Sequence, residues 1–193
     1  MSNPESIQKL KTMEITNKRE FIIRFENKQD HALEYLLGIL NDTRTTTLHT
    51  VRNLTSQELD WQYEKGWNTI GALLLHISAI EHYFRIVYVE NREMTDSEKT
   101  ELMPAVDMGI HLPSLITGKS IDDYIHELSI SRQKLLVSLE GLTFENFSKS
   151  FKTKDDGTES NLAWLLYHLN EDEIYHRGQI SIIRKLIISK STS

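Results

Sequence analysis

The segment from Trp67 to Asn91, WNTIGALLLHISAIEHYFRIVYVEN, is the most apolar long stretch of this 193-residue chain. As a helix it would carry apolar residues on nearly every side rather than on one face. A helix with this pattern is normally enclosed by other elements of the core. We therefore predict a helix here that lies deep within a bundle of helices.

Three more helices are predicted from the spacing of apolar residues. From about Gln29 to Asn53 the leucines recur at helical intervals. Ser120 can cap a helix that ends near Glu140, and Ser160 can cap a last helix that continues to about Ile188. No stretch convincingly predicts a sheet. The sequence therefore predicts an all-α protein, and a four-helix bundle is the simplest architecture.

The segment from Arg92 to Lys119, between the second and third of these helices, is irregular. It contains two of the three prolines and two of the eight glycines, and only Asp96 to Ala105 is predicted to be helical. A connection of this length can carry the chain from one end of a bundle to the other, or cover one end. Shorter signals are a capping box at residues 55–58 and a tight turn at residues 155–157.

The chain divides into a polar N-terminal extension, residues 1–28, and a bundle domain, residues 29–190. The first residues lack the apolar run of a signal peptide, and nowhere do about 18 apolar residues follow one another. We therefore expect a cytoplasmic protein without a membrane-spanning segment. The net charge of −6 argues against nucleic acid as a partner, because binding to phosphates needs a basic surface.

The absence of cysteine restricts the chemistry of this chain. It excludes disulfides, cysteine nucleophiles and zinc sites with sulfur ligands. Any metal site must therefore consist of histidine, aspartate, glutamate and water.

The last predicted helix carries a stripe of ionisable side chains. Trp164, His168, Asp172 and His176 follow one another at four-residue steps and so share one slowly drifting face. Asp172 and His176 are one turn apart and can bind the same ion. His168 and His176 are separated by about 12 Å along the helix, too far for an unstrained pair. Asp172 and His176 are therefore the predicted ligands. His168 is predicted either to contact the ligands without binding the ion itself or to face a substrate.

The stripe also has a simpler interpretation. Asp172 can belong, with Glu171 and Glu173, to a solvated acidic face, and the pattern favours neither interpretation of Asp172. Glu171 and Glu173 are predicted to point away from the stripe, about 100° to either side of it.

His76 lies in the apolar helix, where its neighbours at helical spacing are apolar, so it should face the core. A buried histidine needs a partner for each ring nitrogen, and taken alone His76 is more typical of a structural histidine than of a ligand. The remaining histidines lack comparable neighbours and are predicted to have no functional role: His31, His49, His82, His111 and His126. Gly178 sits within the last helix, between Arg177 and Gln179, and all three are predicted to serve packing or helix pairing.

Two motifs, WNTIGALLLHI at residues 67–77 and YHRGQI at residues 175–180, resemble the DinB/YfiT-like superfamily. The resemblance covers roughly residues 29–188. It implies a four-helix bundle with a long crossover between the second and third helices, usually as a homodimer. It also implies one zinc, nickel or similar ion held by three side chains, two of which match His76 and His176. The third position, four residues before His176, is usually histidine and is Asp172 here.

A carboxylate at this position bears on the identity of the metal. Aspartate can ligate zinc at about 2.0–2.2 Å, and two histidines with one carboxylate also suit iron, manganese or nickel. The expected cofactor is therefore a divalent ion, with zinc or nickel favoured and iron or manganese as alternatives.

The resemblance implies a metal-dependent transferase or isomerase that uses a low-molecular-weight thiol and acts on a small molecule. Three protein ligands would leave positions where an ion lowers the pKa of a bound thiol or water. Thiol transfer and hydrolysis therefore both remain open, with His168 or Glu81 as candidates for a base or an orienting group. The alternative class is a non-catalytic bundle, stress-related or binding a small molecule, in which the metal site is degenerate.

Overall fold

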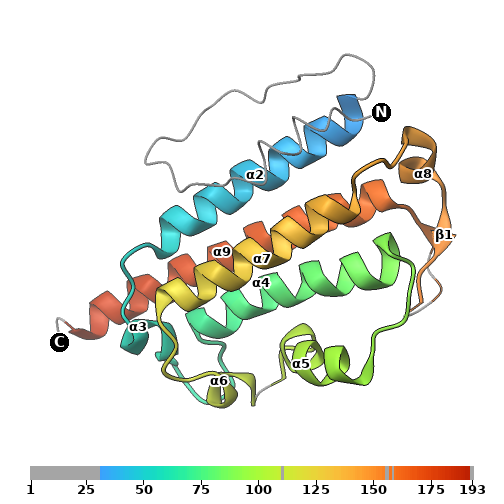
Figure 1. The fold of residues 1–193 in the computed structure, drawn as a ribbon. Coiled ribbons are helices and arrows are strands. Elements are labelled where there is room, and N and C mark those ends of the chain that lie inside the picture. Colours follow the sequence, from blue (N-terminus) through green and yellow to red (C-terminus); the bar gives the residue numbers. More distant parts are fainter. Residues whose placement is uncertain (1–30, 110, 155–156, 158, 192–193) are drawn as a thin grey trace.

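The computed structural model describes residues 31–109, 111–154, 157 and 159–191, and its core is a bundle of four long helices (Figure 1). The predicted all-α fold is confirmed. The predicted extension at residues 1–28 lies outside the described residues. The long helices are α2 (His31–Val51), α4 (Ile70–Phe84, continued by the π-helix η1, Arg85–Val89), α7 (Ile121–Ser138) and α9 (Leu162–Ser191).

Helix α4 occupies the interior position that its composition predicts. It packs against α7 on one side and α9 on another, while α2 packs along α9. The side chain of Thr69 caps its first turn by accepting a hydrogen bond from the backbone N–H of Ala72. Gly71 is required by close packing, because a Cβ there would lie 2.4 Å from the hydroxyl oxygen of Tyr124 on α7.

The combined helix Ile70–Val89 is long and apolar enough to cross a membrane by length and composition alone. However, 72% of its most apolar window is buried inside the structure. Such burial is typical of the core helix of a soluble protein, because its apolar surface is already covered by neighbouring helices.

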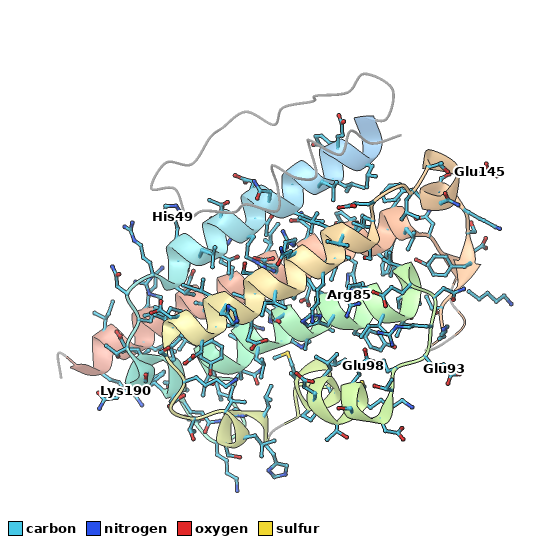
Figure 2. The ribbon with its side chains drawn as sticks, in the orientation of Figure 1. His49, Arg85, Glu93, Glu98, Glu145 and Lys190 are labelled. Carbon is cyan, nitrogen blue, oxygen red and sulfur yellow. The ribbon has the colours of Figure 1, made fainter. Side chains whose placement is uncertain are left out.

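The crossover between η1 and α7 contains the predicted helix, α5 (Asp96–Val106), and a further short one, α6 (Leu112–Leu115). A capping box of Thr95 and Glu98 starts α5. Arg92 then pairs with Glu98 at 2.6 Å and with Glu90 at 2.8 Å, and Figure 2 shows Glu98 at this end of the crossover. Because α5 packs against α4, the crossover covers one side of the bundle.

The remaining short elements lie at the ends of the bundle. The predicted capping box begins α3 (Ser56–Asp60), and the short helix α8 (Phe144–Ser148) follows α7. At the far end of α9, the ammonium of Lys190 lies 4.8 Å from the ring of Tyr63 and 5.4 Å from that of Trp61, where Figure 2 shows it near α3.

Two predictions about the start of α9 need correction. A short hairpin of β1 (Phe151–Lys152) and β2 (Glu159–Ser160) precedes it, although no sheet was predicted. Since Ser160 belongs to β2, the cap is Asn161 instead, whose side chain accepts a hydrogen bond from the backbone N–H of Trp164 at 2.8 Å. Of the predicted turn between the strands, Asp155 and Asp156 lie outside the described residues, and Gly157 has a φ of 75°.

A buried ion-pair network joins the four long helices, each of which contributes one residue: Arg44 on α2, Glu81 on α4, Arg132 on α7 and Glu173 on α9. Arg44 lies 2.9 Å from Glu173 and 3.1 Å from Glu81. Arg132 lies 2.6 Å from Glu81 and 3.3 Å from Glu173. None of the four side chains is more than 5% exposed. Burial opposes the charged form of Glu81, but Arg132 and Arg44 lower the pKa of its carboxyl overall.

The solvated acidic face considered for Glu173 is therefore wrong. Glu173 points away from the stripe, as predicted, but into the core. The two arginines that neutralise it belong to other helices, so the pattern within α9 alone could not reveal them. Glu171 is exposed, as predicted.

Replacing Arg44 with methionine should lower the free energy of unfolding by about 3–5 kcal/mol, because the two buried glutamates would then share a single arginine. Urea denaturation of both proteins measures this difference. The exposed Arg52 provides a control, and its replacement with alanine should change stability by less than about 0.5 kcal/mol. Equal effects of the two substitutions would contradict the importance of the network.

His82 should make the protein less stable at mildly acidic pH. Burial, with help from Arg85 and Lys134, lowers the pKa of its imidazole to about 4, below the ordinary value of about 6.5. The folded protein therefore resists protonation of His82. The contribution of neutral His82 to the free energy of unfolding is fully present above about pH 6.5 and is lost as the pH falls towards about 4. The total loss is up to roughly 3 kcal/mol.

Urea denaturation at several pH values between 7.5 and 4.5 tests this expectation. The His82→Gln variant should lose part of the pH dependence of the free energy of unfolding, whereas replacement of the exposed His126 with glutamine should leave most of it in place. A wild-type pH profile in the His82 variant would show that this imidazole does not resist protonation.

Candidate metal centre

The structure brings together the three residues that the sequence predicts as ligands. His76 lies on α4, and Asp172 and His176 lie one turn apart on α9. One donor atom from each of the three lies within 4.8 Å of the others. The imidazole rings of the histidines meet edge to face, with centroids 4.8 Å apart. Both histidines are buried, while the side chain of Asp172 is 20% exposed, so Asp172 is the most solvent-exposed of the three.

The distances between donor atoms suit a divalent ion. Asp172 Oδ1 lies 3.1 Å from His176 Nε2, and Asp172 Oδ2 lies 3.7 Å from His76 Nε2. Bonds of about 2.0–2.2 Å place two donors roughly 3.4 Å apart at a tetrahedral angle, and about 3.0 Å apart at a right angle. These two distances, which run to different oxygens of Asp172, are close to this range. With one donor atom for each residue the separations reach up to 4.8 Å, so the side chains would have to move closer together to share one ion.

Hydrogen bonds on the far side of each ring set which nitrogen faces the group. His76 Nδ1 lies 2.8 Å from the backbone carbonyl oxygen of Ala105 on α5. A carbonyl can only accept, so Nδ1 carries the proton and Nε2 of the neutral ring offers its lone pair to the site. His176 Nδ1 lies 3.0 Å from Gln179 Oε1 in an equivalent arrangement. Metal-ligating histidines typically have such a partner on the other nitrogen.

Asp172 and His176 shift each other's pKa in opposite directions. Burial opposes the charged form of Asp172, but the two neighbouring histidines lower the pKa of its carboxyl well below the usual range. Burial also opposes the charged form of His176, yet Asp172 raises the pKa of its imidazole overall. Because histidine ligates a metal only when neutral, an ion that binds here competes with a proton for His176.

The buried ion-pair network lies beside the group and holds the same two helices. On α9, Glu173 directly follows Asp172, and on α4, Glu81 follows His76 by five residues. Both glutamates contact Arg44 and Arg132. The network therefore fixes the position of α4 along α9, on which the convergence of the three donors depends.

The other predicted site residues lie elsewhere. The carboxylate of Glu81, a candidate base, is buried and ion-paired with Arg44 and Arg132, which favours a structural role for it. The ring of His168 stacks on Trp164, with centroids 4.8 Å apart, and its Nδ1 lies 3.1 Å from a carboxylate oxygen of Glu171. His168 is thus half-buried on the same face of α9, outside the group of donors.

Sequence reasoning missed two of the partners. Gln179 was predicted to serve packing but accepts a hydrogen bond from His176, and its place three residues later on the same face is the signal that could have shown it. Ala105 acts through its backbone, so its side chain carries no signal. Arg177 does have the predicted structural role, because it donates to the carbonyl oxygen of Thr43 on α2. The side chain of His31 lies outside the described residues.

A model of the DinB superfamily matches residues 39–180, which span most of the bundle and include His76, Asp172 and His176. The chain belongs to the DinB superfamily. No curated protein matches it. Membership agrees with the helical bundle and with a possible metal site, in which Asp172 is the carboxylate of the three residues that could hold an ion.

Replacing Gln179 with leucine should weaken metal binding by roughly 10–100-fold, because His176 would lose the partner that orients its ring. Competition between the protein and a chelating dye for zinc measures this affinity. Gln133, exposed on α7, gives the matched control. If the two glutamine variants bind zinc equally well, Gln179 does not support the site.

Proposed function

We propose that the chain is a divalent-metal-dependent enzyme that acts on a small molecule with the help of a low-molecular-weight thiol, as an S-transferase or isomerase. The observation that carries this proposal is the convergence of two imidazole nitrogens and a carboxylate oxygen, drawn from two helices, at distances that suit one ion. Such a set of two histidines and one carboxylate suits zinc or nickel, and also iron or manganese.

The bound ion would act as a Lewis acid that lowers the pKa of a thiol or water at its open positions. His76 and His176 are held for this task by Ala105 and Gln179. Asp172 balances the charge on the exposed side, where a substrate has access. Since the chain contains no cysteine, a thiolate in this site must come from a small molecule.

An aromatic surface lies one helical turn from Asp172 and supports a role in positioning substrates. Trp164 and His168 stack there, and the ring of Phe84 on α4 lies 6.1 Å from that of His168. Its exposed rings can cover an apolar substrate, while Nε2 of His168 can accept a hydrogen bond, because Nδ1 donates to the carboxylate of Glu171. We therefore assign His168 to substrate positioning rather than to metal binding.

The proposal also includes a cytoplasmic location and a homodimeric state. A reducing compartment keeps low-molecular-weight thiols available, and the burial of the most apolar helix supports a soluble protein.

The first test is the metal content of the protein after reconstitution with zinc, nickel, manganese or iron(II). We expect about one ion per chain in the wild type, and its loss in His176→Ala, because removal of one of three ligands leaves too few donors. Asp172→His, which introduces the usual ligand of the superfamily, should retain the ion, as should the surface control His126→Ala. A wild type without metal under all four conditions would rule out the metalloenzyme.

The metal-loaded protein is then tested for activity with a panel of low-molecular-weight thiols and an activated aryl halide. We expect loss of free thiol, which depends on the ion and is absent in His176→Ala. His168→Ala should raise KM more than it lowers kcat, because a positioning residue contributes mainly to substrate binding. Metal binding with hydrolysis of activated esters, but no thiol transfer, would indicate a hydrolase instead.

A further inference from the structure

Two tryptophans and a tyrosine gather where α3 leads into α4, at the end of the bundle opposite α8 (Figure 1). The ring centroids of Trp61 and Tyr63 lie 6.1 Å apart, and those of Tyr63 and Trp67 lie 4.8 Å apart. Trp61 and Tyr63 are half-buried, while Trp67 is 43% exposed. We call these three residues the aromatic cluster. Single apolar residues on a surface need no explanation, but three aromatic rings in contact mark a binding site.

The main chain holds the aromatic cluster in place. The side chain of Gln62 donates a hydrogen bond from Nε2 to the carbonyl oxygen of Trp67 at 2.6 Å. The backbone N–H of Trp67 donates to the carbonyl oxygen of Glu64 at 3.0 Å, and Gly66 supports this turn with a φ of 92°. The rings are therefore arranged before any ligand arrives, which lowers the entropic cost of binding one.

A cation already lies on the aromatic cluster. The ammonium of Lys190 is over the ring of Tyr63 at 4.8 Å and over that of Trp61 at 5.4 Å, and Figure 2 shows Lys190 at this end of the molecule. Both distances are within the range of about 6 Å in which an aromatic face attracts a positive charge. Two rings that face one cation form part of a cage, the arrangement by which proteins recognise quaternary ammonium groups.

Lys190 is an occupant that another cation can displace. Its side chain is exposed and belongs to the last turn of α9, so it keeps many alternative rotamers in water. A lysine ammonium is also strongly hydrated, and its contact with the rings competes with that hydration. A trimethylammonium group cannot donate hydrogen bonds to water, and its methyl groups add apolar contact with the rings.

The charges beside the rings also favour a cation. Asp60 directly precedes Trp61, and Glu64 directly follows Tyr63, against the single positive charge of Lys65. Neighbouring carboxylates raise the local concentration of cations at such a surface. The composition of this segment therefore agrees with a positively charged ligand rather than with an anion.

We propose that the aromatic cluster binds the trimethylammonium group of an organic cation, and that Lys190 occupies the same place when this ligand is absent. Lys190 follows His176 by fourteen residues, or about 21 Å along α9. The site is therefore separate from the metal centre, and binding there requires no ion. In the free protein Lys190 lowers the apparent affinity of the site, because the ligand must first displace it.

Titration of the full-length protein into tetramethylammonium or choline, followed by the methyl proton resonance, tests the proposal. We expect a saturable upfield shift, because aromatic rings shield a group that lies over their faces. Lys190→Ala should bind severalfold more tightly than the wild type, since it removes the competing cation. Replacement of Lys185, exposed on the same helix, with alanine is the matched control and should leave the affinity unchanged.

Two further comparisons test the chemistry of recognition. The neutral isostere of choline, 3,3-dimethylbutan-1-ol, should bind roughly tenfold more weakly, because it has the same shape without the charge. Tyr63→Leu should lose binding, whereas Tyr63→Phe, which keeps an aromatic face, should retain most of it. Unchanged helicity and metal content show that the variants are folded.

Vesicles of phosphatidylcholine distinguish the source of the trimethylammonium group. Cosedimentation that Tyr63→Leu abolishes would identify a lipid headgroup, and choline binding without cosedimentation would identify a soluble compound. Any one of three results would overturn the proposal: no binding by either the wild type or Lys190→Ala, equal binding of the neutral alcohol, or binding that Tyr63→Leu leaves intact. Because metal content is measured separately, failure of this site is distinguishable from failure of the metal centre.

Discussion

The buried ion-pair network is the interaction on which the rest of the structure depends. Two arginines and two glutamates, one from each long helix, balance in charge within the core. Arg44 on α2 also donates to the carbonyl oxygen of Leu128 on α7, and Arg132 on α7 donates to that of Leu40 on α2. Apolar contacts are not directional, whereas these hydrogen bonds require defined positions. The network therefore specifies how far each helix is shifted along its neighbours. The relative positions of the three donors on α4 and α9 depend on that alignment.

The fold could be predicted because each long helix has a signal within its own stretch of sequence. The apolar composition of α4, the capping boxes before α3 and α7, and the irregular crossover all act within a few residues, where periodicity and capping chemistry are informative. The hairpin before α9 could not be predicted, since strands of two residues have no periodicity, and its presence moved the cap from Ser160 to Asn161. The network was also hidden, because Glu81 and Glu173 find their arginines on helices distant in the sequence.

For the metal centre, spacing on α9 was enough to pair Asp172 with His176, because both lie on one helix. Joining them to His76 on another helix required the resemblance to a family, since no local pattern relates α4 to α9. The ion pairs of Glu81 could not be predicted for the same reason. A carboxylate five residues after His76 looks available in the sequence, but the tertiary structure commits it to Arg44 and Arg132.

The hydrogen bond from His76 to the carbonyl oxygen of Ala105 has a consequence for how such proteins diverge. Because the acceptor belongs to the main chain, the side chain at residue 105 does not determine which nitrogen of the imidazole carries the proton. That side chain is restricted for another reason, because Ala105 is buried in a cluster with Ala72 and Ala79 of α4. The position of α5 is also restricted, because a displaced α5 would remove the carbonyl acceptor that orients the imidazole of His76. Divergence of this segment is thus limited both by the path of its main chain and by the small buried side chain at residue 105, and comparison of residues alone would detect only the second limit.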